Sequence, residues 1–180
     1  HYTANGKESK DRTTIGVIYA KQPPARIAGG GMAINPRFII KAGDGNSEVR
    51  AMSEISKDTL ITGFTPHMHL RGKDMNWVLT LPDGREEMLL NVPKYDFNWQ
   101  IVYNPMKPIF APKGTRLHVD AHFNNSSSNR FNPDPNRTVY RGRMTWEEMM
   151  SPFFSIVTDA KTDAKTILKL RGQTRIDNGA

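Results

Sequence analysis

The chain has 180 residues, which is enough for one complete hydrophobic core but too few for two ordinary domains. Hydrophobic residues make up 37% of the sequence and charged residues 24%, a balance that excludes a wholly disordered chain. No run of about 18 consecutive apolar residues occurs, and this excludes a membrane-spanning helix.

The net charge is +7, from 25 Lys and Arg against 18 Asp and Glu. A nucleic-acid-binding face needs its basic residues clustered and interleaved with aromatic ones. Here they are scattered along the chain, for example at Arg26, Lys57, Lys94 and Arg141. We therefore predict no nucleic-acid partner and assign the positive charge to solubility.

Cysteine is absent from the sequence. The chain can therefore form no disulfide, no thiolate metal site and no thiol nucleophile. Any metal ion must be held by His, Met or carboxylate side chains.

Short segments of alternating apolar and polar residues, separated by 14 Gly and 12 Pro, run through the sequence. This pattern is typical of antiparallel strands. The sequence predicts an all-β fold, an antiparallel jelly-roll β-sandwich, with helical character only over 162–170. The predicted strands are 14–20, 32–41, 49–55, 60–70, 76–81, 87–92, 99–103, 116–123 and 153–158.

Two polar segments interrupt the strands. Gly43-Asp44-Gly45-Asn46 predicts a loop at which two structural units could meet. Residues 124–135 (NNSSSNRFNPDP) are too polar and too rich in Pro for regular structure. They predict a long loop, and in a compact domain such a loop is often functional.

The sharpest local motif is the His-x-His of residues 66–72 (PHMHLRG). On a strand, His67 and His69 would present two imidazoles on one face, about 6 to 7 Å apart along the chain. Such a pair can bind one metal ion, and two surface histidines on a polar face give the same pattern. Imidazole combined with thioether suits copper, whereas zinc would be expected to use a carboxylate or a third His. Candidates for a third ligand are His1, His118, His122, the carboxylates and nine Met.

Three aromatic residues, Tyr95, Phe97 and Trp99, fall within six residues beside polar neighbours. This composition suits the wall of a substrate pocket. The alternative is a hydrophobic strand edge beneath a loop.

The stretches HMHLRGKDM, RLHVDAHF and TWEEMM resemble the catalytic second domain of the type II, ascorbate-dependent copper monooxygenases, the family of peptidylglycine α-hydroxylating monooxygenase and dopamine β-monooxygenase. These motifs are most similar to those of bacterial members of the family. The resemblance implies copper as cofactor, with His67, His69 and Met149 as ligands of the oxygen-activating ion. Met150 is the alternative to Met149, because the two are adjacent.

The first residues, beginning His1-Tyr2, resemble the end of the first domain of that family. There a His-Tyr strand supplies one ligand of a second, electron-donating copper, which makes His1 a candidate ligand of that ion. The resemblance divides the chain into 1–42, the end of a truncated first domain, and 43–180, the oxygen-activating domain with a loose C-terminal tail. The upstream remainder of its own chain would then be a partner.

The sequence departs from the family near the site. Thr65 stands where the peptide enzyme has an Arg for the substrate carboxylate, and Ser151 and Phe153 stand where it binds peptide through Asn and Tyr. A glycine-extended peptide substrate is therefore not expected. His122 and Met150 take the places of family cysteines, so His122 is a candidate extra ligand or a group bonded to one. The alternative is a His within a polar hydrogen-bond network.

The resemblance implies a periplasmic or secreted protein that hydroxylates a C–H bond of a small organic substrate with O2 and with ascorbate or another reductant. Three alternatives stay open. The first is a copper-binding or electron-transfer domain without hydroxylase activity. The others are an enzyme in which an N-terminal His1 chelates copper, as in secreted polysaccharide monooxygenases, and a structural sandwich whose metal site has decayed.

Overall fold

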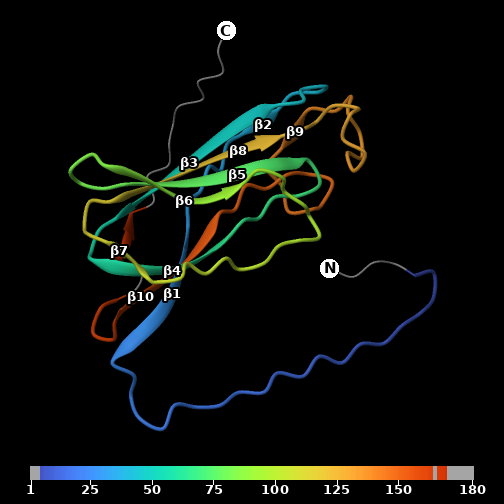
Figure 1. The fold of residues 1–180 in the computed structure, drawn as a ribbon. Coiled ribbons are helices and arrows are strands. Elements are labelled where there is room, and N and C mark those ends of the chain that lie inside the picture. The colour runs from blue at the N-terminus through green and yellow to red at the C-terminus, as the bar shows by residue number, and fades with distance from the viewer. Residues whose placement is uncertain (1–4, 164–165, 170–180) are drawn as a thin grey trace.

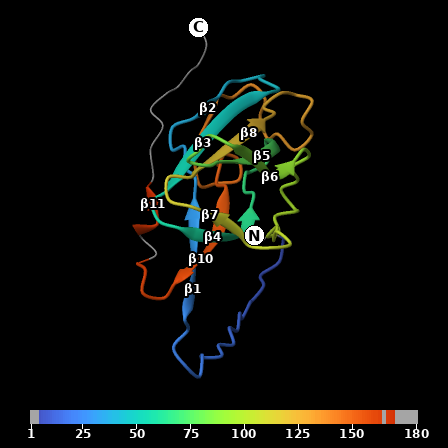
Figure 2. The ribbon, with the colours of Figure 1, turned by 60° about the vertical axis from the view of Figure 1, so that its left-hand side comes forward.

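The computed structural model describes residues 5–163 and 166–169, and its strands pack as two layers (Figures 1 and 2). All strand pairs are antiparallel, which confirms the predicted all-β sandwich. The strands are β1 (Arg26–Met32), β2 (Ile39–Ile40), β3 (Ser47–Ile55), β4 (Thr59–Thr65), β5 (Gly72–Thr80), β6 (Glu86–Val92), β7 (Ile109–Ala111), β8 (Arg116–Phe123), β9 (Val139–Tyr140), β10 (Phe153–Asp159) and β11 (Leu168–Lys169).

The two layers are a four-stranded sheet in the order β1-β10-β4-β7 and a five-stranded sheet in the order β11-β3-β8-β5-β6. A short ribbon of β2 and β9 is separate from both sheets. Neighbours in these sheets are mostly distant in sequence, so the fold depends on long-range pairing.

The core lies between the two sheets and is built by alternation along the strands. On β8 the side chains of Leu117, Val119, Ala121 and Phe123 are buried, and the residues between them lie on the other face. Phe64 of the four-stranded sheet packs against Trp77 of the five-stranded sheet, with ring centroids 6.1 Å apart. Each fully buried large apolar side chain contributes about 1.5 to 3 kcal/mol.

Several predicted strands differ from the structure. The segment 14–20 is an extended arm whose Ile15, Ile18 and Tyr19 are exposed, and it pairs with no strand among the described residues (Figure 1). An alternating pattern forms a sheet only where a partner strand is present. The predicted strand 32–41 is interrupted over residues 33–38, which include Pro36, a residue that cannot donate to a ladder. The predicted strand 99–103 forms only one bridge, between Tyr103 and Phe64.

The predicted helix at 162–170 is also absent from its described part, where β11 pairs with β3 instead. Pairing with a sheet edge outweighs the weak helical preference of so short a segment. The C-terminal tail from residue 170 lies outside the described residues. Within the described part of the chain, no helix is long and apolar enough to cross a membrane.

The predicted junction between residues 42 and 43 falls inside a single sandwich. Strand β1 pairs with β10 along its whole length, and β2 pairs with β9. Phe38 and Ile40 are buried in the core, where Phe38 stacks on Phe123 with ring centroids 5.7 Å apart. Residues from Arg26 onward therefore belong to the same structural unit, because their apolar side chains complete its core.

Candidate metal centre

The two motif histidines lie on an extended segment that connects β4 to β5. Pro66 ends β4, and Met68 then forms a single antiparallel bridge with Met150. Met68 is buried in the core, so His67 and His69 lie on the opposite side of the segment. Their ring centroids are 5.3 Å apart and the rings are nearly perpendicular, at 85°. The structure thus brings the two imidazoles together as the His-x-His spacing predicts, although beyond the end of the strand.

Each imidazole is oriented by an oxygen acceptor at its Nδ1 atom. His67 Nδ1 lies 2.5 Å from Gln100 Oε1, and the Gln100 amide is itself fixed because its Nε2 donates to Phe97 O at 2.6 Å. His69 Nδ1 lies 3.4 Å from Glu147 O. An oxygen acceptor requires the proton on Nδ1, which leaves the lone pair of Nε2 on His67 for a metal ion. The His69 ring also bonds to the backbone of Met144.

His69 is held in the neutral form that metal binding requires. Its side chain is buried, with 3% of the residue exposed. Burial, followed by the charge of His67, lowers the pKa of His69 below its ordinary value. The ring is therefore uncharged at neutral pH and can donate its lone pair.

The structure separates the two methionines of the TWEEMM motif. Met150 is buried in the core opposite Met68, whereas Met149 is half-buried. In an antiparallel ladder, the pairing of Met68 with Met150 sets Met149 opposite His69 on the other face. The geometry therefore favours Met149 over Met150 as the third donor.

The carboxylate of Glu148 fastens the two motifs to each other. It is fully buried, and its Oε2 accepts from the backbone N–H of His69 at 3.0 Å and of Met149 at 3.2 Å. Its Oε1 accepts from the N–H of Arg71 at 2.7 Å. Burial raises the pKa of Glu148 to about 7, and the three N–H donors and the Arg71 charge oppose that rise.

Arg71 joins this carboxylate to the base of the polar loop. Its guanidinium is buried 4.0 Å from Glu148 Oε1, and it donates from Nε to Asn125 Oδ1 at 2.7 Å and from a terminal nitrogen to Trp146 O at 3.0 Å. Glu148 and Arg71 are not among the residues that the sequence predicts to be functional. Their only signal was that each lies inside a motif that carries the resemblance.

Tyr95 and Gly72 fix the backbone between the two histidines. The Tyr95 hydroxyl donates to Met68 O at 2.5 Å and accepts from the Met68 N–H at 2.9 Å. Burial raises the pKa of Tyr95 well above its ordinary value, so the hydroxyl stays protonated as a donor. A Cβ atom at Gly72 would lie only 2.6 Å from Tyr95 Cδ1, so this close packing requires glycine.

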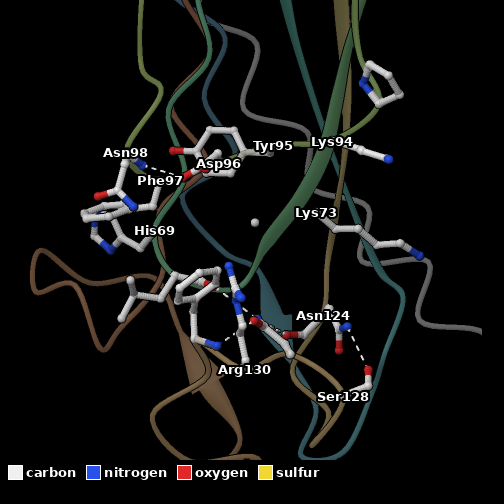
Figure 3. Close-up of a pocket in the computed structure, with 15 residues that line it drawn as sticks. His69, Lys73, Lys94, Tyr95, Asp96, Phe97, Asn98, Asn124, Ser128 and Arg130 are labelled. Atoms are coloured by element: carbon white, nitrogen blue, oxygen red, sulfur yellow. Dashed lines mark hydrogen bonds between the residues drawn. The ribbon is translucent and has the colours of Figure 1, made fainter.

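Beside His69 is a cavity of about 600 Å³ (Figure 3). Tyr95 and Phe97 line it, and Phe97 meets His69 edge to face with ring centroids 6.3 Å apart. The predicted pocket wall is therefore formed by these two residues. Trp99 is 62% exposed and lies outside the lining, because the chain turns after Asp96 instead of continuing as a strand. The loop at 124–135 forms much of the opposite wall.

The remaining predicted ligands lie elsewhere. His122 is on the solvent-side face of β8, and its Nδ1 lies 2.6 Å from Asp74 Oδ1 on the neighbouring strand. It does not line the cavity that contains His69, so it has the alternative role of a His in a polar network. His118 lies further along the same face. His1 lies outside the described residues.

The residues present fit a copper ion. The described part of the chain contains no cluster of three or more His, Cys, Asp or Glu that could hold a metal. Met149, which the ladder sets opposite His69, is the candidate third donor that the sequence motif and the register both indicate. Two neutral imidazoles and one thioether suit copper, the cuprous state above all.

Comparison with known proteins adds no family. No family model matches the sequence, and no curated protein matches it. Among solved structures, those of the infectious bursal disease virus Gx strain and of the VP2 subviral particle of the same virus each align at 9% identity with a TM-score of 0.31. Each alignment covers 79% of this chain and 35% of the viral chain, and similarity at this level carries no argument about function.

Proposed function

We propose that this chain carries the oxygen-activating copper centre of a monooxygenase, which hydroxylates a C–H bond of a small organic substrate with O2. One observation carries the proposal. Two imidazoles lie 5.3 Å apart, each with an oxygen acceptor at Nδ1, on the face of the segment where the ladder sets Met149. A cavity large enough for an organic ligand opens beside His69.

The protein contributes binding, orientation and exclusion of water. When bound, copper would supply the one-electron chemistry that activates O2. His67, His69 and Met149 would hold the ion, and Gln100 and the Glu147 carbonyl keep the two imidazoles in the correct tautomer. The thioether favours the reduced ion.

Around these donors, two groups hold the site in place. Glu148 fixes the backbone of His69 and of Met149 at the same time, so the nitrogen and sulfur donors keep their relative positions. Phe97 covers the edge of His69 toward the cavity, where an apolar surface would hold substrate and limit water. We further propose that ascorbate or another external reductant is the electron source, and that the protein is periplasmic or secreted.

The proposal is tested by loading the chain with Cu(I) and measuring stoichiometry, affinity and X-ray absorption. We expect one copper ion with two nitrogen donors and one sulfur donor. Met149→Leu should remove the sulfur signal and weaken Cu(I) binding by about tenfold or more. The matched control is Met106→Leu, because Met106 is fully exposed and its replacement should change neither readout.

Three results would contradict the proposal. If the chain bound no copper, or if Met149→Leu left the sulfur signal unchanged, the His67–His69 pair would not be the predicted centre. If copper bound as expected but the chain, joined to the upstream remainder that the resemblance implies, consumed no O2 in the presence of a reductant, it would carry a copper-binding or electron-transfer domain instead.

A further inference from the structure

The cavity beside His69 carries an unbalanced positive charge. Lys73, Lys94 and Arg130 line it, against one acidic lining residue, Asp96. None of the three cations forms an ion pair with an acidic side chain among the described residues. The three cations are exposed, and their excess positive charge around the cavity attracts an anion.

The charges are arranged asymmetrically with respect to the metal centre. Figure 3 shows His69, Phe97 and Asp96 on one side of the cavity and Lys73 and Lys94 on the other, with Arg130 reaching in from the 124–135 loop. An anionic group would therefore be repelled from the His69 side and drawn to the opposite side.

Neutral groups position two of the cations. Lys73 Nζ donates to Asn46 Oδ1 at 2.5 Å, and the Arg130 guanidinium stacks over the Phe131 ring at 4.5 Å. Neither contact neutralises the charge. Both cations can therefore still pair with an anionic ligand, and a guanidinium can bind a carboxylate through two parallel hydrogen bonds.

The loop that carries Arg130 is fastened to the histidine segment. Asn129 Nδ2 donates to Leu70 O at 3.1 Å and to Asn124 O at 3.0 Å. Asn129 Oδ1 accepts from the Phe131 N–H at 3.0 Å, which closes a local turn. Arg130 and Phe131 are thus held at a fixed place relative to His69.

The rest of the lining is suited to an apolar body. Phe97 and Phe131 both face the cavity, together with Leu70 and Pro93. A volume of about 600 Å³ is in the range of cavities that bury small organic ligands. A lining that combines cations with aromatic surface suits a ligand that has both an anionic group and an apolar body.

We propose that this cavity binds a small organic carboxylate, with its aromatic or apolar body against Phe97 and its carboxylate directed to Arg130, on the side where Lys73 and Lys94 add positive charge. In this orientation the body of the ligand, and not its charge, lies beside His69. That the carboxylate is the substrate rests on the monooxygenase proposed above. Its affinity for the cavity needs no metal ion, so the two proposals can fail separately.

Calorimetric titration of the metal-free chain with three matched probes tests the inference. Phenylbutyrate, phenylbutyramide and phenylbutylamine share one apolar body and differ in charge. We expect saturable binding of phenylbutyrate, at least about tenfold tighter than that of the amide and weakened by added salt, and the weakest binding for the amine.

Variants separate the cavity from general surface charge. Arg130→Met and Lys73→Met should each weaken phenylbutyrate binding by about fivefold or more. Asp96→Asn should strengthen it, because the replacement removes the one anionic lining group. Lys113→Met is the matched control, since Lys113 is exposed just before β8, at the opposite end of that strand from the cavity, and should leave the affinity unchanged.

Three results would overturn the inference. They are no saturable binding of phenylbutyrate, equal affinity for carboxylate and amide, and wild-type affinity in Arg130→Met. Circular dichroism and the thermal midpoint of each variant confirm that it is folded, and Asp96→Asn gives an effect of opposite sign that loss of folding cannot produce. If phenylbutyrate bound as expected while Cu(I) did not bind, the cavity assignment would stand and the monooxygenase would fall.

Discussion

At the scale of single residues, the candidate centre depends on a group that does not touch the metal. Glu148 bonds to the backbone of His69, Arg71 and Met149, which come from two segments far apart in the chain. A buried carboxylate is costly unless its oxygens are satisfied. Here the three N–H donors and the nearby Arg71 guanidinium provide that compensation.

Replacing this carboxylate is therefore expected to loosen the site and the fold together. Glu148→Gln presents an amide N–H₂ to backbone donors and leaves the Arg71 guanidinium buried without its anionic neighbour. We expect a loss of about 3 kcal/mol in the free energy of unfolding, measured by urea denaturation of the metal-free chain, and weaker Cu(I) binding.

Glu147→Gln is the matched control for this change. The Glu147 side chain accepts only an exposed N–H, that of Met144, and His69 contacts the Glu147 carbonyl, which the substitution retains. Its cost should stay below about 1 kcal/mol. Equal stability of the two variants would mean that the Glu148 carboxylate does not hold the motifs together.

At the scale of elements, sequence patterns were informative where a strand has one buried face. Strand β8 has the predicted bounds 116–123 because its alternation of Leu117, Val119, Ala121 and Phe123 matches a sheet with one side in the core. The same pattern over 14–20 was misleading, because no partner strand covers Ile15 or Ile18 in the described part of the chain.

The candidate site shows the same contrast. His67 and His69 lie on the same side of one extended segment because they are two residues apart. The local sequence is therefore sufficient to predict this arrangement. The contacts of Glu148, Arg71 and Tyr95 join segments 27 to 79 residues apart, and nothing in the local sequence specifies them. The ordered form of the 124–135 loop also escaped prediction, because its Asn side chains bond to backbone groups that only the folded chain brings near, as Asn129 does to Leu70 O.

The polar face of β8 also makes stability depend on pH. Burial lowers the pKa of His118 below 6.5, and Asp120 and Glu86 offset part of that effect. The unfolded chain therefore takes up a proton at this residue at a higher pH than the folded chain does. The contribution of His118 to the free energy of unfolding is fully present above pH 6.5. It is lost as the pH falls from 6.5 through the folded-state pKa of His118.

This dependence is checked by comparing the unfolding free energies of the wild type and His118→Gln between about pH 7.5 and about pH 5. The free energy of unfolding of the wild type should fall relative to that of His118→Gln as the pH falls, since glutamine takes up no proton. Comparing two proteins cancels the titrations they share, including that of Glu148, whose raised pKa acts in the opposite direction. A difference that is constant with pH would show that His118 titrates alike in the folded and unfolded chains.

At the scale of the whole molecule, the sandwich includes a segment that the resemblance assigned to another domain. Seven residues of β1 pair with β10, and β10 in turn pairs with β4, which leads into the histidine segment. Phe38 and Ile40, which also precede the predicted junction, are buried in the same core. The candidate metal centre and residues 26–42 are therefore parts of one sandwich.

Two shortened chains distinguish one sandwich from two units. A chain beginning at Gly43 lacks β1, β2 and the buried Phe38 and Ile40, each worth about 1.5 to 3 kcal/mol. Because a domain of this size is stable by only about 5 to 15 kcal/mol, we expect this chain to lose most of its stability or to fail to unfold cooperatively in calorimetry. A chain beginning at Ala25 keeps the Ala25 carbonyl that accepts from the Ala160 N–H and removes only the exposed arm, so its midpoint should stay near that of the full chain. If the chain from Gly43 melted at the same temperature as the chain from Ala25, the junction predicted from the sequence would be a true domain boundary, and β1 would be an appended strand that the candidate metal centre does not need.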